Sequence, residues 1–263
     1  MRRLVLILAL ALGVSAPAWA QPAGHWPNGG QAAIALTYDD SLVSQLDNAV
    51  PQLDAAGFKG TFFLMGRQIG PNVLRWRAAA AEGHELGNHT INHPCSAASY
   101  QMPVQYTSES YSVPVLLTEI GVMNSYLQAI DGQTDHQLAT PCGQTVAGGQ
   151  DYVQALRTAN LVRYVRAAAD FDLHGQPVDP FNVPCHFFGV GSTGADMIAY
   201  VESVRRRGGF GVIGFHGVGG DYLQVTSEAH QQLITYLKTH DHDFWIGTFT
   251  QVMDAATAHP APQ

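Results

Sequence analysis

The sequence is poor in charged residues, which make up only 13% of its 263 positions, while hydrophobic residues make up 46%. So few charges and so many apolar side chains exclude an intrinsically disordered chain. Internal repeats, low-complexity tracts and long linkers are also missing, which excludes a repeat array. Beyond residue 20 no apolar run is long enough to cross a bilayer, so we expect no membrane insertion. The remaining class is a globular chain long enough to bury one large core.

Basic residues are scarce as well, with 13 lysines and arginines against 21 aspartates and glutamates. Two arginines at the N-terminus precede an apolar run at residues 4–14, and Ala18 and Ala20 are the small residues that a signal peptidase reads. We therefore expect residues 1–20 to be a secretory signal peptide, with export to the periplasm or the extracellular space. An uncleaved membrane anchor is the alternative. The mature chain would carry a net charge of −10, which disfavours nucleic acid and anionic lipid as partners.

Only three cysteines are present, Cys95, Cys142 and Cys185. An oxidising compartment favours one disulfide bond and one free thiol, and three pairings are possible. A metal site built from all three cysteines is the competing hypothesis. It is the weaker one, because no two of them lie close in sequence as in most zinc sites.

Short apolar runs alternate with helical patterns along the chain. Strands are predicted at residues 34–38, 60–64, 84–88, 137–140, 161–165, 211–215 and 244–246, and helices at residues 43–56, 73–81, 115–130, 152–159 and 227–238. Residues 170–195, rich in proline, glycine and aspartate, are expected to form a long loop. About seven strands alternating with helices favour a single α/β domain over residues 21–263 with a barrel-like arrangement, although periodicity alone does not exclude an open sheet.

Five polar side chains lie directly after predicted strands or in the loops that follow them, where α/β barrels build their active sites. The adjacent carboxylates of Asp39 and Asp40 repel each other unless a cation lies beside them. One helical turn between His89 and His93 would bring both imidazoles to one ion, and His216 can act as a general acid near neutral pH. Each feature alone is typical of an ordinary turn or a structural histidine. Two histidines with a carboxylate at one barrel end indicate a catalytic metal site.

Three stretches resemble the motifs of the polysaccharide deacetylases, carbohydrate esterase family 4: Thr37-Tyr38-Asp39-Asp40, His89-Thr90-Ile91-Asn92-His93-Pro94 and Phe215-His216. The resemblance covers residues 34–253 and implies a distorted (β/α) barrel. It implies that Asp39 is the general base, that His216 is the general acid, and that one divalent ion, expected to be zinc, is held by Asp40, His89 and His93. Pro141-Cys142-Gly143 is similar to the third family motif, which implies that the Cys142 backbone N–H helps to hold the oxyanion.

The chain departs from the family pattern at several positions. The family arginine that steadies the catalytic aspartate falls on Ala139, and the aromatic residue of the same motif falls on Cys142. The Asp–Trp pair of the fourth motif has no match, and Asp170 and Asp172 are nearest by position. The leucine of the fifth motif is Gly214, and we expect Gly214 and Gly217 to leave room beside His216 for a bulky substrate.

Cys95 directly follows one motif and Cys142 occupies another, so we predict a disulfide bond between them that braces two catalytic loops. The predicted function is metal-dependent removal of N-acetyl groups from an amino-sugar polymer or oligomer of chitin or peptidoglycan type. One alternative is an O-acetyl esterase acting on an acetylxylan-like polysaccharide. The other is a catalytically weak glycan-binding homologue, which the missing motifs favour and the retained acid–base and metal residues oppose. The expected partner in each case is an acetylated glycan.

Overall fold

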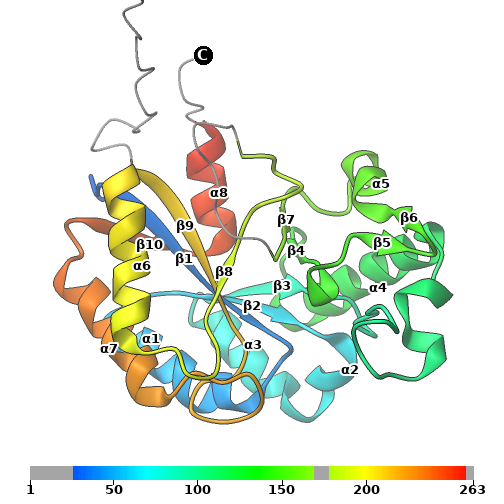
Figure 1. Cartoon of the computed structure of the whole chain (residues 1–263), viewed down its shortest axis with the longest axis horizontal. Coiled ribbons are helices and arrows are strands. Elements are labelled where there is room, and N and C mark those ends of the chain that lie inside the picture. Colours follow the sequence, from blue (N-terminus) through cyan, green and yellow to red (C-terminus); the bar gives the residue numbers. More distant parts are fainter. Residues whose placement is uncertain (1–25, 169–177, 259–263) are drawn as a thin grey trace, which may run out of the picture.

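The computed structural model describes residues 26–168 and 178–258 (Figure 1). The predicted signal peptide at residues 1–20 lies outside the described residues, as do Asp170 and Asp172. Among the described residues, no helix is both long and apolar enough to pass through a membrane.

An eight-stranded sheet forms the centre of the fold, and every strand pair in it is parallel. Its strands are β1 (Ala32–Asp39), β2 (Thr61–Leu64), β3 (Glu85–Asn88), β4 (Leu138–Ala139), β7 (Val165–Arg166), β8 (His186–Phe187), β9 (Gly209–Phe215) and β10 (Phe244–Gly247). The order is β7-β4-β3-β2-β1-β9-β8, with β10 paired to β1. The central strand β1 pairs with β9 along most of its length, with β10 at its start and with β2 at its end.

The two ends of this sheet approach each other through residues 180–183. The Val165 N–H donates to the Pro180 carbonyl, and the Ala167 N–H donates to the Val183 carbonyl, both at 2.8 Å. The chain then runs directly from Val183 into β8, so this segment connects the β7 edge to the β8 edge. The predicted distorted (β/α) barrel is therefore confirmed, with one strand more than expected.

Helices cover the outside of the sheet (Figure 1), except for the last one, whose Phe249, Val252 and Met253 belong to the core on the inner face. They are α1 (Val50–Ala56), α2 (Gly66–Ile69), α3 (Val73–Ala81), α4 (Val113–Asp131), α5 (Tyr152–Ala159), α6 (Gly194–Arg207), α7 (Ser227–Thr239) and α8 (Phe249–Ala258). A π-helical turn at Gln45–Ala49 leads into α1, and 3-10 turns lie at Gly70–Asn72, Val104–Tyr106, Ser108–Ser110 and Pro141–Gly143. A two-residue hairpin joins β5 (Val146–Ala147) to β6 (Gln150–Asp151), apart from the main sheet.

The prediction of a long loop at residues 170–195 is corrected by the structure in two places. The expected loop contains strand β8, which is only two residues long and takes its register from β9 rather than from local sequence. It also contains the start of α6, where Thr193 and Asp196 form a reciprocal capping box and the apolar residues Met197, Val201 and Val204 share one buried face. Helices α6 and α8 were both missing from the predicted elements.

The alternation of side chains along β1 explains how Asp39 is presented at the end of the strand. Tyr38 lies in the core between the sheet and the outer helices, whereas Ala33 and Ala35 lie in a second core on the inner face, with Phe249 of α8. Because successive side chains of a strand point to opposite faces, Asp39 shares the inner face with the two alanines. The strand therefore places a carboxylate at the mouth of the barrel, at the end of an apolar strip.

Candidate metal and catalytic site

The five predicted residues lie together at the carboxyl ends of β1, β3 and β9. Asp40 Oδ1 is 3.4 Å from both His89 Nε2 and His93 Nε2, and those two nitrogens are 3.1 Å apart. On the same carboxylate, Oδ2 is 3.7 Å from His216 Nε2. Asp39 Oδ2 lies 3.8 Å from His89 Nε2, so both carboxylates border one small polar centre.

The loop that carries the two histidines is not the helical turn that the spacing suggested. Asn88 Oδ1 accepts a hydrogen bond from the Thr90 N–H at 2.7 Å, and Thr90 Oγ1 accepts one from the His93 N–H at 2.9 Å. Thr90 and His93 both have left-handed backbone angles, with φ of 60° and 56°. Two successive side-chain-to-backbone turns thus reverse the chain and bring His93 back over His89.

His89 is oriented by its second ring nitrogen. It is 2% exposed, and its Nδ1 lies 2.9 Å from the Ala139 carbonyl oxygen. A carbonyl only accepts, so Nδ1 carries a proton, and Nε2 is the nitrogen that faces Asp40. Metal-binding histidines are held in this way in most proteins.

The geometry of the three donor atoms fits a metal ion. A tetrahedral zinc ion with bonds of about 2.0–2.1 Å places its ligand atoms about 3.3 Å apart, close to the separations between Asp40, His89 and His93. Asp40 Oδ1 is buried and has no hydrogen-bond partner among the described residues. An unsatisfied buried carboxylate oxygen is costly unless a cation or donor occupies the space before it. These three residues therefore form a possible metal-binding site.

The charges of this cluster prepare it for a cation. Burial by itself would raise the pKa of Asp40, but the imidazoles of His89, His93 and His216 beside it hold that pKa well below its usual range. Burial, followed by the charge of His89, lowers the pKa of His93 to about 4. Asp40 is therefore anionic and His93 neutral at neutral pH, which are the forms that bind metal.

Arg166 corrects the expectation that Asp39 has lost its arginine. Its Nη2 donates to Asp39 Oδ1 at 2.7 Å and to Oδ2 at 2.5 Å, and both side chains are buried. The guanidinium lies 4.9 Å from the ring centroids of Phe63 and Phe187. Arg166 is the register partner of Ala139 across β4 and β7. The cation is thus supplied from one strand further along the sheet.

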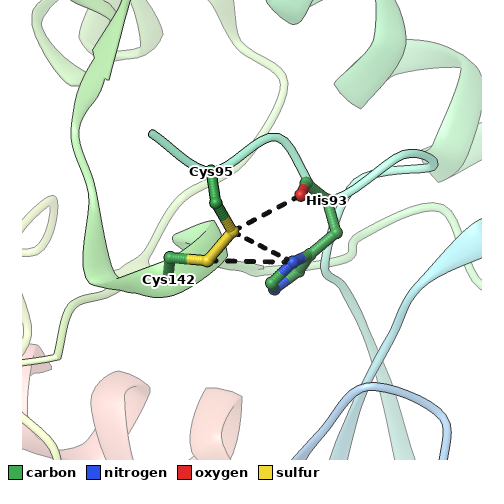
Figure 2. Close-up of side chains that lie close together, drawn as sticks. All are labelled: His93, Cys95 and Cys142. Atoms are coloured by element: carbon green, nitrogen blue, oxygen red, sulfur yellow. Dashed lines mark hydrogen bonds between the residues drawn. A yellow bond between two sulfur atoms is a disulfide. The ribbon is translucent and has the colours of Figure 1, made fainter. Parts of the chain in front are cut away.

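The predicted disulfide between Cys95 and Cys142 is confirmed, with Cα atoms 5.8 Å apart. Figure 2 shows both sulfur atoms beside the His93 ring, with Nδ1 at 3.4 Å from Cys95 Sγ and 3.9 Å from Cys142 Sγ. A disulfide carries no proton, so only Nδ1 can donate in these contacts, which leaves Nε2 free as a ligand. Cys185 is buried with a free thiol, so the three-cysteine metal site was wrong.

The Pro141-Cys142-Gly143 stretch follows β4 as a tight turn, and its disulfide fixes it against the histidine loop. Cys142 has φ of 54°. Gly143 has φ of 66°, and a Cβ at that position would lie 2.5 Å from the Ala168 Cβ. Only glycine fits there without strain. The turn therefore borders the cluster of Asp40, His89 and His93 on the side of His93.

His216 directly follows β9, and the Gln45 side chain connects the His216 backbone to the end of β1. The Gln45 Nε2 donates to the Asp39 carbonyl at 2.5 Å and to the His216 carbonyl at 3.1 Å. The expectation that Gly214 and Gly217 leave room for substrate was wrong, because a Cβ would lie 2.5 Å from the Phe187 ring at Gly214 and 2.0 Å from the Gly220 carbonyl oxygen at Gly217. Phe187 fills the space beside Gly214, and its ring centroid is 5.4 Å from that of His216.

Sequence reasoning missed two residues of this site. Arg166 lies at the end of a two-residue strand, and only its register with Ala139 relates it to the family motif. Tyr222 donates a hydrogen bond from its hydroxyl group to Asp40 Oδ2 at 2.7 Å, from the loop that follows His216. No motif marks that tyrosine in the sequence.

Comparisons with known proteins agree with this architecture. The family model of the polysaccharide deacetylases matches residues 27–162. A peptidoglycan-N-acetylglucosamine deacetylase from Bacillus cereus is 35% identical over 81 residues, which are 28% of this chain and 36% of that protein. A gellan lyase from a Bacillus species is 33% identical over 96 residues, 36% of this chain and 4% of the lyase. This chain therefore spans far less than two thirds of either relative.

Among solved structures, a Mycobacterium smegmatis protein assigned to the polysaccharide deacetylases has a TM-score of 0.64 and 18% identity. The match covers 90% of this chain and 95% of that one. Identity this low shows the fold alone.

Proposed function

Because the chain belongs to the polysaccharide deacetylase family, we propose that it is a metal-dependent hydrolase that removes N-acetyl groups from an amino-sugar polymer or oligomer. The single observation that carries the proposal is the cluster around Asp40. Its buried, unpartnered Oδ1 stands at tetrahedral spacing from two imidazole nitrogens, with a second carboxylate and a third histidine beside it.

Asp40, His89 and His93 would hold one divalent ion, with zinc expected from this mixture of carboxylate and imidazole donors. When bound, the ion would polarise the acetyl carbonyl and make a nearby water molecule more acidic. In both histidines Nδ1 has a partner, the Ala139 carbonyl for His89 and Cys95 Sγ for His93. Nε2 of each ring therefore faces the centre shared with Asp40, which supports this assignment.

The reaction divides among the remaining residues. Asp39 is held in place by Arg166. It accepts a proton from the water molecule while the water oxygen attacks the acetyl carbon. The Cys142 N–H would donate to the oxyanion, and one such donor is worth about 3 kcal/mol in other enzymes. His216 gives its proton to the departing nitrogen as the C–N bond breaks, and the products are acetate and a free amino sugar.

We further propose that residues 1–20 are removed on export and that residues 21–263 form one catalytic domain in the periplasm or outside the cell. The apolar run with its preceding arginines supports the first point, and the single continuous sheet among the described residues supports the second. An acetylated glycan is the expected partner. Peptidoglycan-type substrate is favoured by the B. cereus relative, which bears the name of a peptidoglycan deacetylase.

The experiment that tests the proposal is acetate release from acetylated chitooligosaccharides, peptidoglycan and acetylxylan, with and without a chelator. Release from an amino-sugar substrate that stops with chelator and returns with zinc supports an N-deacetylase. Release from acetylxylan alone would replace the proposal with the esterase alternative. If the protein releases acetate from none of these substrates but still binds glycan, the glycan-binding alternative replaces the proposal.

His216→Ala separates the two enzyme classes further. Expelling an amine requires a proton, whereas an alkoxide beside a metal ion leaves more readily. A general acid is typically worth about 10²–10⁴-fold, so N-acetyl hydrolysis should fall by that order and O-acetyl hydrolysis by visibly less. Equal losses on both substrates would mean that His216 orients the substrate instead.

A further inference from the structure

The two oxygens of Asp40 have different surroundings. Oδ1 faces His89 and His93 and has no hydrogen-bond partner among the described residues, whereas Oδ2 accepts a hydrogen bond from Tyr222 at 2.7 Å. Tyr222 therefore holds the Asp40 carboxylate through Oδ2, and Oδ1 remains available to the proposed ion. Neither Asp39 nor Arg166 contributes to this arrangement.

The loop that carries Tyr222 is built to hold it in place. It folds back on itself, with the Gly217 N–H donating to the Tyr222 carbonyl at 3.2 Å and the Val225 N–H donating to the Gly217 carbonyl at 3.0 Å. Asp221 and Leu223, on either side of the tyrosine, have φ of 62° and 48°. Non-glycine residues in this region cost about 1–3 kcal/mol each and persist only where surrounding contacts enforce them.

Those contacts come from the segment that follows Asp40. Asp221 Oδ2 accepts a hydrogen bond from the Ser44 N–H at 2.8 Å, and Asn48 Nδ2 donates to the Val218 carbonyl at 2.8 Å. The loop after β9 is thus fastened to the loop after β1. The hydroxyl group and the carboxylate that it contacts are fixed relative to each other from both sides.

We propose that Tyr222 is a positioning residue for the metal ligand Asp40, and that its hydrogen bond sets the affinity of the site for zinc. This inference rests on the proposed metal site. With Oδ2 engaged by Tyr222, Asp40 would offer Oδ1 alone to the ion. Groups that fasten a metal ligand in this way typically change metal affinity by about 10–100-fold when removed.

A different role for the same residue is a stacking platform for a sugar ring. Tyr222 is 47% exposed, and its ring centroid is 6.2 Å from that of His216, so a glycan bound there would touch the ring. The two roles depend on different parts of the side chain. Removing only the hydroxyl group abolishes the hydrogen bond to Asp40 and leaves the ring for stacking.

The test is the zinc affinity of Tyr222→Phe in the mature protein, measured by competition with a chromogenic chelator. Tyr236→Phe is a matched control, because Tyr236 also donates to a carboxylate, Glu202 Oε1, at 2.7 Å, between α6 and α7 and outside the site. We expect the zinc dissociation constant to rise about 10–100-fold in Tyr222→Phe and to stay unchanged in Tyr236→Phe. Excess zinc should then restore kcat, with KM for the glycan unaltered.

An unchanged zinc affinity in Tyr222→Phe would overturn the proposal, whether or not KM rises. His93→Ala distinguishes this outcome from failure of the metal site itself. If His93→Ala also binds zinc with wild-type affinity, the site assignment is wrong. If His93→Ala loses zinc while Tyr222→Phe keeps it, only the role of Tyr222 is wrong. Circular dichroism spectra of the variants check that each is folded.

Discussion

Arg166→Met should remove most of the activity and a large part of the stability, because it leaves the Asp39 carboxylate buried without its cation. The Asp39 and Arg166 side chains are only 4% and 2% exposed. Methionine keeps an apolar chain between the rings of Phe63 and Phe187, so the loss of charge is separated from the loss of packing. Removing one partner of a buried ion pair typically costs about 3–5 kcal/mol. Against a total of about 5–15 kcal/mol for a folded domain, that is a large fraction.

The assay is urea unfolding of wild type, Arg166→Met, Asp39→Asn and the double variant, followed by circular dichroism. The double variant removes both charges, so we expect it to recover much of the stability lost in Arg166→Met, while acetate release stays absent. A double variant no more stable than Arg166→Met would refute this account. So would an Arg166→Met protein whose free energy of unfolding lies within about 1 kcal/mol of wild type, since such losses are typical of ordinary surface positions.

A further set of variants tests whether the arginine can be moved from β7 to β4 and still support Asp39. Ala139 and Arg166 are register partners in neighbouring strands, about 4.8 Å apart, and both side chains lie on the inner face. An arginine at position 139 would start from the neighbouring strand, on the same inner face as Arg166. The variant Ala139→Arg/Arg166→Ala should therefore regain part of the activity that Arg166→Ala loses. Failure to regain any would show that position 166 supplies more than a cation.

Three further predictions concern the metal, the disulfide and acid stability. His93→Ala should lose zinc, measured by metal analysis, whereas Asp39→Asn should keep zinc and lose about 10²–10⁴-fold in activity; metal loss in Asp39→Asn would reverse the two roles. Replacing Cys95 and Cys142 by serine opens a link between residues 47 apart and should lower the free energy of unfolding by about 2–4 kcal/mol in urea titration, and no change would contradict this. Burial lowers the pKa of His230 to about 3 from 6.5, so its neutral form stabilises the fold above pH 6.5 and this contribution is lost as pH falls toward 3. Between pH 6 and 4 the free energy of unfolding should fall by about 1.4 kcal/mol per pH unit more in wild type than in His230→Gln, and equal slopes would contradict it.

Much of the site was readable because its residues are tied to local sequence. Asp39 and Asp40 end an apolar strand, and His216 follows another, so the geometry of parallel strands brings them to one edge whatever the rest of the chain does. The pairing of Cys95 with Cys142 followed from the same reasoning, since each lies beside a motif. These positions depend on strand ends, which hydrophobic patterns locate well.

The prediction of a helical turn between His89 and His93 was wrong because of local hydrogen bonds that hydrophobic patterns do not reveal. Spacing of four residues suits a helix, but Asn88 and Thr90 offer their side chains to backbone N–H groups and form turns instead. The nitrogens still converge, because the loop reverses within the same number of residues. Helix α6 was within reach of the sequence, since its capping box and apolar spacing are both visible there.

By itself the sequence determined the alternation of strands and helices and the convergence of Asp39, Asp40, His89, His93 and His216, because periodicity and motif spacing act over short stretches. The barrel was implied by the resemblance of the motifs to those of the polysaccharide deacetylases, since periodicity alone did not exclude an open sheet. Only the tertiary structure decided which residue steadies Asp39 and which holds Asp40. Arg166 reaches its carboxylate across 127 positions and Tyr222 reaches Asp40 across 182. Such contacts depend on the register of two-residue strands and on strained loops, and neither can be predicted from periodicity or motif spacing.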